Sequence, residues 1–308
     1  MTSTMHDRLA EWGHLLENCG DKPSRKGVHA LRVVTLRLQA EFERDLEDLP
    51  RASHQAQAML QFGKLAEKLR RALGPVRELD VWIGKLRDLR ASLSHGGEYV
   101  PRTTQQNVRG IERLEERLKR KRRSAEKKLV AEIEKRGRRL VKAGEEIETA
   151  LSGCLFGEES GIAEELAARF RTVRAEFPTL DEANLHEFRK RIKMVRYLAE
   201  MRGSSDPAIG QIATQIKKLQ SAIGEWHDWQ ALAQVVHSGH HAKSKDLAEL
   251  LQAIARESFE TALSTANSVT ARMQGADLEQ IEPSSLQHRS PPARSEDDWA
   301  AVEDRKLA

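Results

Sequence analysis

Histidine and arginine occur three residues apart at two distant places in the chain. His29 is followed by Arg32, and His186 is followed by Arg189. Each pair opens a segment of apolar and basic residues, VHALRVVTLRLQAEF and LHEFRKRIKMVRYLAEM. An arginine guanidinium binds phosphate oxygens in a bidentate geometry, and histidine adds a donor whose charge depends on its pKa. These residue types indicate binding of a phosphate-rich anion rather than bond-making chemistry.

A second pair of segments follows the first in the same order. The segments are LGPVRELDVW and IGEWHDWQAL, and each places a basic or imidazole side chain and a carboxylate after an apolar-Gly pair. Arg77-Glu78 therefore aligns with His227-Asp228. The separations 29–74 and 186–224 differ by seven residues, which is about two helical turns and preserves the helix face. An internal duplication accounts for the whole pattern.

Helical spacing divides both histidine segments into a cationic side and an apolar side. Arg32 and Arg37 lie on the side of His29, while Leu31 and Leu38 lie opposite. The second segment likewise separates a polar set from an apolar set, namely Arg189, Lys190, Lys193, Arg196 and Tyr197 from Phe188, Ile192, Val195 and Ala199. Like charges at these spacings repel, so a bound polyanion explains them better than a solvated surface.

The composition predicts an all-α protein that buries a substantial core. The 308 residues are 39% hydrophobic and only 5% aromatic, with few of the β-branched and aromatic runs typical of strands. The net charge of +4 is too small to identify a polyanion partner by itself. Cys19 and Cys154 form no Cys-x-x-Cys pattern, so we expect neither a disulfide framework nor a cysteine zinc site.

Proline and glycine breaks divide the chain into predicted helices. One domain is expected over 1–275, with repeats at about 20–151 and 159–275, and a disordered tail over 276–308. The predicted helices span residues 3–19, 24–48, 51–73, 75–93, 103–151, 159–176, 180–202, 207–222, 225–238 and 244–274. The basic run 119–123 lies among glutamates, which favours i,i+4 pairing on a solvated surface. An auxiliary phosphate-binding patch is the alternative.

The four segments resemble the CHAD family, the conserved-histidine α-helical domains. The family pattern is His-x-x-Arg-Val with further basic residues in each repeat, and an LG-x-x-R-D/E-L-D segment between, and the resemblance covers roughly residues 20–275. It implies two four-helix bundles related by a pseudo-two-fold axis around a central basic channel. It also implies non-catalytic binding of inorganic polyphosphate there, in the cytoplasm and on polyphosphate granules.

The resemblance assigns polyphosphate binding to a set of basic residues in both repeats. The set is His29, Arg32, Arg37, Arg77, His186, Arg189, Lys193 and Arg196, followed by Lys26, Arg70, Arg71, Tyr197, Lys217, Lys218 and His227. Leu36 and Gln39 replace basic residues of the family pattern, so we expect a weaker first repeat. Glu78, Asp80 and Asp228 are expected to pair with arginines or cap helices.

Other functions fit the sequence less well. Nucleic acid is the alternative partner, although stacking aromatics and a helix-turn-helix are missing. His227-Asp228 resembles a metal-dependent phosphohydrolase motif, but such a site needs further His and Asp ligands, and the other repeat has Arg77-Glu78. A purely structural scaffold leaves the repeated motifs unexplained.

We expect no enzyme activity, cofactor or metal. His237, His240 and His241 are interpreted as surface histidines. The N-terminus resembles no signal peptide, and no stretch resembles a membrane span, so a cytoplasmic protein is expected.

Overall fold

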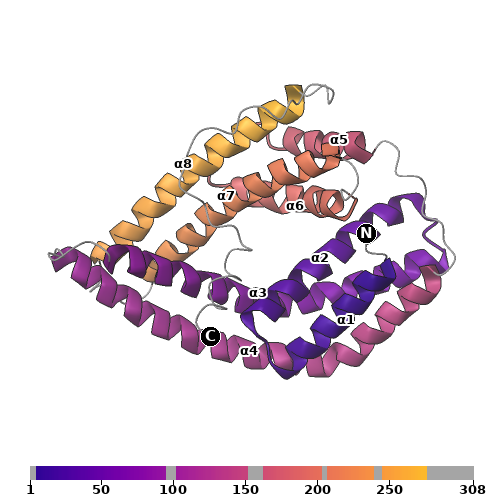
Figure 1. The fold of residues 1–308 in the computed structure, drawn as a ribbon, viewed down its shortest axis with the longest axis horizontal. Helices are drawn as coiled ribbons and strands as arrows, with labels where there is room; N and C mark the ends of the chain where they lie inside the picture. Colours follow the sequence, from indigo (N-terminus) through magenta and orange to yellow (C-terminus); the bar gives the residue numbers. More distant parts are fainter. Residues whose placement is uncertain (1–4, 95–101, 152–161, 203–206, 239–244, 276–308) are drawn as a thin grey trace. The chain divides into compact units, whose positions relative to one another are not determined.

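The described part of the chain is entirely helical. The computed structural model describes residues 5–94, 102–151, 162–202, 207–238 and 245–275 (Figure 1). Within these ranges the chain forms eight helices and no strand, which confirms the all-α prediction. The helices are α1 (Met5–Asp21), α2 (Arg25–Asp48), α3 (His54–Ser94), α4 (Arg102–Leu151), α5 (Ile162–Ala175), α6 (Leu185–Arg202), α7 (Pro207–Ser238) and α8 (Lys245–Gly275). The predicted disordered tail over 276–308 lies outside the described residues.

Two predicted helix breaks are wrong. The chain runs without interruption through Pro75 in α3 and through Gly224 in α7. A proline inside a helix costs about 3 kcal/mol because it removes a backbone donor and crowds the preceding turn. Leu73 and Val76, on either side of Pro75, are fully buried. Tertiary packing along the whole length of α3 therefore outweighs the local preference to stop.

Side-chain caps define where the two histidine helices begin. The hydroxyl of Ser24 accepts a hydrogen bond of 3.0 Å from the Gly27 amide and caps α2. Before α6, Oδ1 of Asp181 accepts a hydrogen bond of 3.0 Å from the Asn184 amide. Such caps satisfy amides that have no partner inside the helix. Ser24 caps α2, and Asp181 stabilises the turn that precedes α6, each five residues before the histidine of its motif.

Three hydrophobic cores hold the helices together. Helices α1 to α4 enclose one core that includes Trp12 and Phe62, and α5 to α8 enclose a second that includes Phe188 and Trp226. A third core joins the two halves of the chain at the far ends of their long helices, and its fully buried members are Leu86, Ile111, Leu118, Leu232 and Leu251 from α3, α4, α7 and α8. The halves therefore share apolar packing.

Helix α2 contributes buried residues to both the first and the second hydrophobic core. Leu31 and Leu38 are buried in the first core, as their helical spacing predicts. Leu36, at 4% exposure, and Ala40 are buried in the second core, where α2 lies against α6 (Figure 1). The leucine that replaces a basic residue of the family pattern is thus a packing residue between α2 and α6. This contact places the two histidine helices side by side.

Truncation of this packing residue should destabilise the whole fold. We expect Leu36→Ala to lower the free energy of unfolding by about 2 to 5 kcal/mol, because it leaves a cavity between α2 and α6. The control is Leu60→Ala, since Leu60 is 40% exposed on α3 and its truncation should change stability by less than about 0.5 kcal/mol. Urea unfolding followed by circular dichroism measures both. Equal effects of the two substitutions would contradict the assigned packing.

Candidate functional site

The arginines of the two His-x-x-Arg motifs make the same contact in their respective halves. Nη1 of Arg32, on α2, donates a hydrogen bond of 3.3 Å to the main-chain carbonyl of Arg70 on α3. Nε of Arg189, on α6, donates one of 3.2 Å to the carbonyl of Gln220 on α7. Each acceptor lies four residues before the glycine of the second repeated motif. Each arginine therefore fastens its helix to the main chain of the next long helix.

The repeated glycines make room for these guanidinium groups. A Cβ added to Gly224 would lie 2.9 Å from Nη2 of Arg189 and 3.3 Å from its Nε, closer than side-chain atoms normally approach. A Cβ added to Gly74 would lie 3.9 Å from Nη1 of Arg32, which is ordinary contact. The glycine requirement is therefore strict in the second half and relaxed in the first.

The arginines from the two halves converge. Burial lowers the pKa of the Arg32 guanidinium, and the positive charges of Arg70, Arg189 and Arg77 lower it further. These four side chains come from α2, α3 and α6, and each is half-buried. Buried like charges destabilise one another unless an anion lies between them. The arrangement is therefore suited to receive negative charge.

Two histidines stack beside these arginines. The rings of His186 and His227 lie 3.9 Å apart between centroids, with an interplanar angle of 28°. Nδ1 of each ring is buried and has no hydrogen-bond partner among the described residues. Burial lowers the pKa of both, that of His227 to about 4, and nearby cations including Arg189 and Lys190 add to the effect. At neutral pH both rings are uncharged, and an anion close to them would favour their protonation.

These groups form what we call the cationic cluster. Its members influence one another electrostatically, and they are Arg32, Arg70, Arg77, His186, Arg189, Lys190, Lys193 and His227. All except Lys190 were among the binding residues expected from the sequence. Lys190 was placed on the right helix face but left outside that set. Its position four residues after His186 is the signal that identifies it.

A carboxylate lies next to the cationic cluster. Burial raises the pKa of Asp228 to about 6, while the cations of Lys85, Arg189 and Arg77 act in the opposite direction. Lys85 also forms an ion pair with Glu225 across α3 and α7. No sequence pattern indicates Lys85 at this place, because only the packing of α3 against α7 brings it close.

Two other predictions about acids and histidines concern this region. The expectation that Asp80 pairs with an arginine is confirmed, since its Oδ1 accepts a 2.9 Å hydrogen bond from Nε of Arg122. The described residues contain no group of three or more His, Cys, Asp or Glu arranged to hold a metal ion. His240 and His241 lie outside these residues.

Several expected binding residues already have acidic partners. Nη2 of Arg37 donates a 2.9 Å hydrogen bond to Glu200 on α6. Nε of Arg196 lies 3.2 Å from the same carboxylate without hydrogen-bond angles, and its guanidinium covers the Tyr197 ring at 4.7 Å. Tyr197, expected on the cationic face, is 1% exposed and belongs to the second core. These residues join α2 to α6.

The other expected residues lie at the surface or beside the cluster. Arg71 forms an exposed ion pair with Glu67 one turn away. Lys26, Lys217 and Lys218 are exposed, and His29 is half-buried on α2, one turn before Arg32. Gln39 donates a 3.5 Å hydrogen bond to the carbonyl of Gly63.

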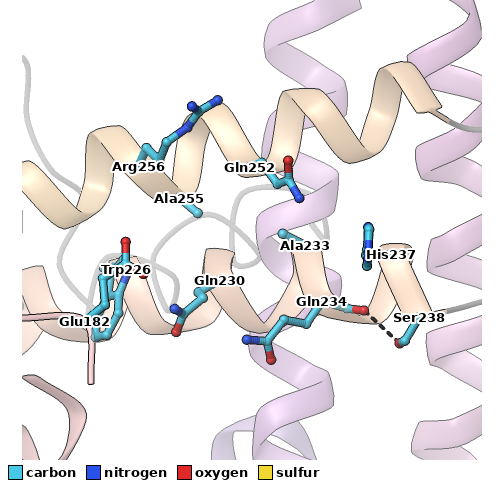
Figure 2. Close-up of a pocket in the computed structure, with 10 residues that line it drawn as sticks. All are labelled: Glu182, Trp226, Gln230, Ala233, Gln234, His237, Ser238, Gln252, Ala255 and Arg256. Carbon is cyan, nitrogen blue, oxygen red and sulfur yellow. Dashed lines mark hydrogen bonds between the residues drawn. The ribbon is translucent and has the colours of Figure 1, made fainter. Parts of the chain in front are cut away.

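A pocket of about 610 Å³ lies between α7 and α8 (Figure 2). Gln230, Gln234 and His237 line it from α7, and Gln252 and Arg256 from α8. No residue of the cationic cluster is among its lining residues. Trp226, which lines the pocket, has its ring centroid 6.3 Å from that of His227 in the cluster.

The chain belongs to the CHAD family, because the family model described as CHAD domain matches residues 5–237. The match includes α1, which the resemblance had omitted, and ends within α7, so that α8 lies beyond it. The chain matched no curated protein sequence and no solved structure. Among the described residues, no helix is long and apolar enough to cross a membrane.

The close approach of Arg189 to α7 predicts a difference between two glycines of that helix. Gly210→Ala should raise the free energy of unfolding by up to about 1 kcal/mol, because alanine favours helices and a Cβ there meets nothing within 4 Å. Gly224→Ala should lack most of this gain, because the methyl group displaces Arg189 and removes a hydrogen bond worth about 1 kcal/mol. Urea unfolding of both variants measures the difference. Equal stabilisation would show that Arg189 does not depend on Gly224.

The lowered pKa of His227 predicts a pH dependence of stability. His227 is neutral in the folded chain down to about pH 4 but takes up a proton near pH 6.5 when unfolded, so its contribution to stability falls as pH drops through this window. Asp228, whose pKa is raised to about 6, contributes with the opposite sign. His227→Gln should therefore lose less stability than the wild type between about pH 7 and pH 5. Urea unfolding at both pH values measures this, with the exposed His54→Gln as control; identical losses in all three proteins would refute it.

Proposed function

We propose that the cationic cluster binds inorganic polyphosphate and that the chain does so without catalysing a reaction. The observation that carries the proposal is the convergence of Arg32 and Arg189, one from each repeated motif, beside Arg70 and Arg77. Guanidinium groups bind phosphate oxygens in a bidentate geometry, and a chain of phosphates can bridge several of them at once. Membership of the CHAD family agrees with a polyphosphate-related function.

The energetic argument is that a polyanion relieves a repulsion built into the fold. Burial and neighbouring cations both disfavour the charged form of Arg32, yet two helix-to-helix hydrogen bonds hold Arg32 and Arg189 in place. A bound phosphate chain converts the repulsion into attraction.

We extend the proposal to the arrangement of the repeats. The equivalent contacts of Arg32 and Arg189 support two four-helix bundles related by a pseudo-two-fold axis, with the cationic cluster lining a central channel. The halves contribute unequally, since Leu36 packs in the second core and Arg37 is paired with Glu200, whereas Lys193 occurs in the cluster. The second half is expected to dominate binding.

The degree of burial favours polyphosphate over nucleic acid at the cationic cluster. Seven of its eight members are half-buried, and Lys190 alone is exposed. A thin phosphate chain can reach between helices, whereas the phosphates of a duplex lie on a broad rigid surface. Polyphosphate granules in the cytoplasm are the proposed location.

A metal-dependent phosphohydrolase is the weaker alternative. The charged groups that shift the pKa of Asp228 are Lys85, Arg189, Glu225 and Arg77, and three of these are cations. Cations beside a carboxylate suit binding of phosphate more than binding of a metal ion.

The decisive experiment replaces three members of the cationic cluster that lie on α6. The variant His186→Gln, Lys190→Gln, Lys193→Gln should bind long-chain polyphosphate at least about tenfold more weakly than the wild type, a loss of about 1.4 kcal/mol or more. Wild-type binding should weaken steeply with salt, because bound phosphates release their counterions. Fluorescence anisotropy at two salt concentrations, with duplex DNA as competitor, measures affinity, salt dependence and selectivity.

The control has the same charge change at exposed positions elsewhere: His54→Gln, Lys64→Gln, Arg171→Gln. It should bind polyphosphate as the wild type does. Equal weakening by the control, or equal competition by DNA against the cluster, would overturn the proposal.

A further inference from the structure

Helix α4 contains the excess positive charge of the entire chain. It carries 16 of the 51 Lys and Arg residues but only 9 of the 47 Asp and Glu residues. Its net charge of +7 exceeds the +4 of the whole chain, so that the remainder is net negative. The charge of α4 is therefore a local feature that the overall composition hides.

These cations are concentrated on one side of the helix, which we call the α4 basic face. The face is defined by its exposed members, namely Arg109, Arg113, Arg120, Lys121, Arg123, Lys127, Lys128, Lys135, Arg138, Arg139 and Lys142. At about 100° per residue they occupy an arc of about 160°. Leu118, Leu129 and Leu140 lie on the opposite side and are buried. The face extends along about 50 Å of helix, at 1.5 Å per residue.

Ion pairing does not neutralise this face. In the described residues, the acids beside the run 119–123 are taken by Lys119, which pairs with Glu116, and by Arg122, which pairs with Glu126 and Asp80. Among the face's own members, Lys142 alone has a carboxylate within 4.0 Å in the described part of the chain. The i,i+4 pairing expected for the run 119–123 is confirmed for Lys119 with Glu115 and for Arg122 with Glu126.

Like charges along the α4 basic face repel one another. Arg120 and Arg123 are three residues apart, and Arg123 and Lys127 are four apart, at spacings where like charges destabilise a helix by about 0.2 to 0.5 kcal/mol per pair. Glu116, Glu134, Glu145 and Glu146 fall within the same arc, so that the eleven cations of the face exceed its acids by seven. Anion binding relieves this repulsion.

We propose that the α4 basic face binds the phosphates of duplex nucleic acid without base specificity. A helix with side chains is about 10 to 12 Å wide and matches the major groove, about 12 Å wide, whose two phosphate walls can meet cations on both edges of the arc. A thin phosphate chain on a convex helix would reach only one edge. Residues 108–151 contain no aromatic side chain for stacking on single strands, and no Asn or Gln for reading adenine.

This partner is separate from the one proposed for the cationic cluster. Helix α4 packs through its buried side on α1 and α3, as Figure 1 shows, whereas the members of the cluster come from α2, α3, α6 and α7. No residue belongs to both surfaces. Each can therefore be removed without altering the other.

The test uses the full chain and a fluorescent 30-base-pair DNA duplex in a salt titration. The variant is Arg113→Gln, Arg120→Gln, Lys127→Gln, Arg138→Gln, which clears one row of the face. We expect its affinity for the duplex to fall at least about tenfold, and the slope of log K against log salt to become shallower by about 3 to 4, because four phosphate contacts are lost. The matched control, Lys64→Gln, Arg87→Gln, Arg171→Gln, Arg272→Gln, has the same net charge and should bind like the wild type.

The outcomes separate this proposal from the polyphosphate proposal. Support requires that the face variant loses DNA and keeps polyphosphate, while the cluster variant keeps DNA. No duplex binding by the wild type, or equal loss in the control, overturns the nucleic-acid proposal alone. If the face variant loses polyphosphate instead of DNA, the basic face is a polyphosphate surface and the proposal is wrong.

Discussion

The arrangement of this protein depends on a guanidinium held against the main chain of a neighbouring helix. Arg189 donates to the carbonyl of Gln220 and lies where a side chain at Gly224 would otherwise stand. Arg32 makes the corresponding contact with the carbonyl of Arg70. A carbonyl inside a helix already accepts one hydrogen bond and has a second lone pair to offer. The arginine of each His-x-x-Arg motif therefore contacts the long helix that carries the glycine of the second motif.

These helix-to-helix contacts of Arg32 and Arg189 bring fixed positive charges together in a partly buried region. The surrounding groups moderate that charge in a pH-dependent way. The rings of His186 and His227 remain neutral at neutral pH, and Asp228 has a pKa of about 6 among several cations. The fold thus combines arginines that are always charged with three groups whose charge responds to an anion. Binding and protonation are coupled in such a site.

The two halves share motifs but have different roles at their boundary. In α2, Leu36 packs in the second core, and Arg37 pairs with Glu200. In α6, the residues beside His186 keep their positive charge near the cluster. Helix α2 contributes Arg32 to the cationic cluster, whereas α6 contributes four of its members. Duplication followed by such division lets a single chain build an asymmetric site from two similar units.

The sequence by itself determined the helical class, the repeated motifs and the apolar side of each histidine helix, while the resemblance to the CHAD family indicated seven of the eight residues in the cationic cluster. Local periodicity and repeated spacing carry that information, because both depend on residues close together in the chain. Tertiary structure alone decided that α3 continues through Pro75, that Glu200 neutralises Arg37 and that Lys85 approaches Asp228. Each of these features depends on which helices pack together. The free energy of that packing exceeds the helix propensities of individual residues, which are what a sequence pattern reports.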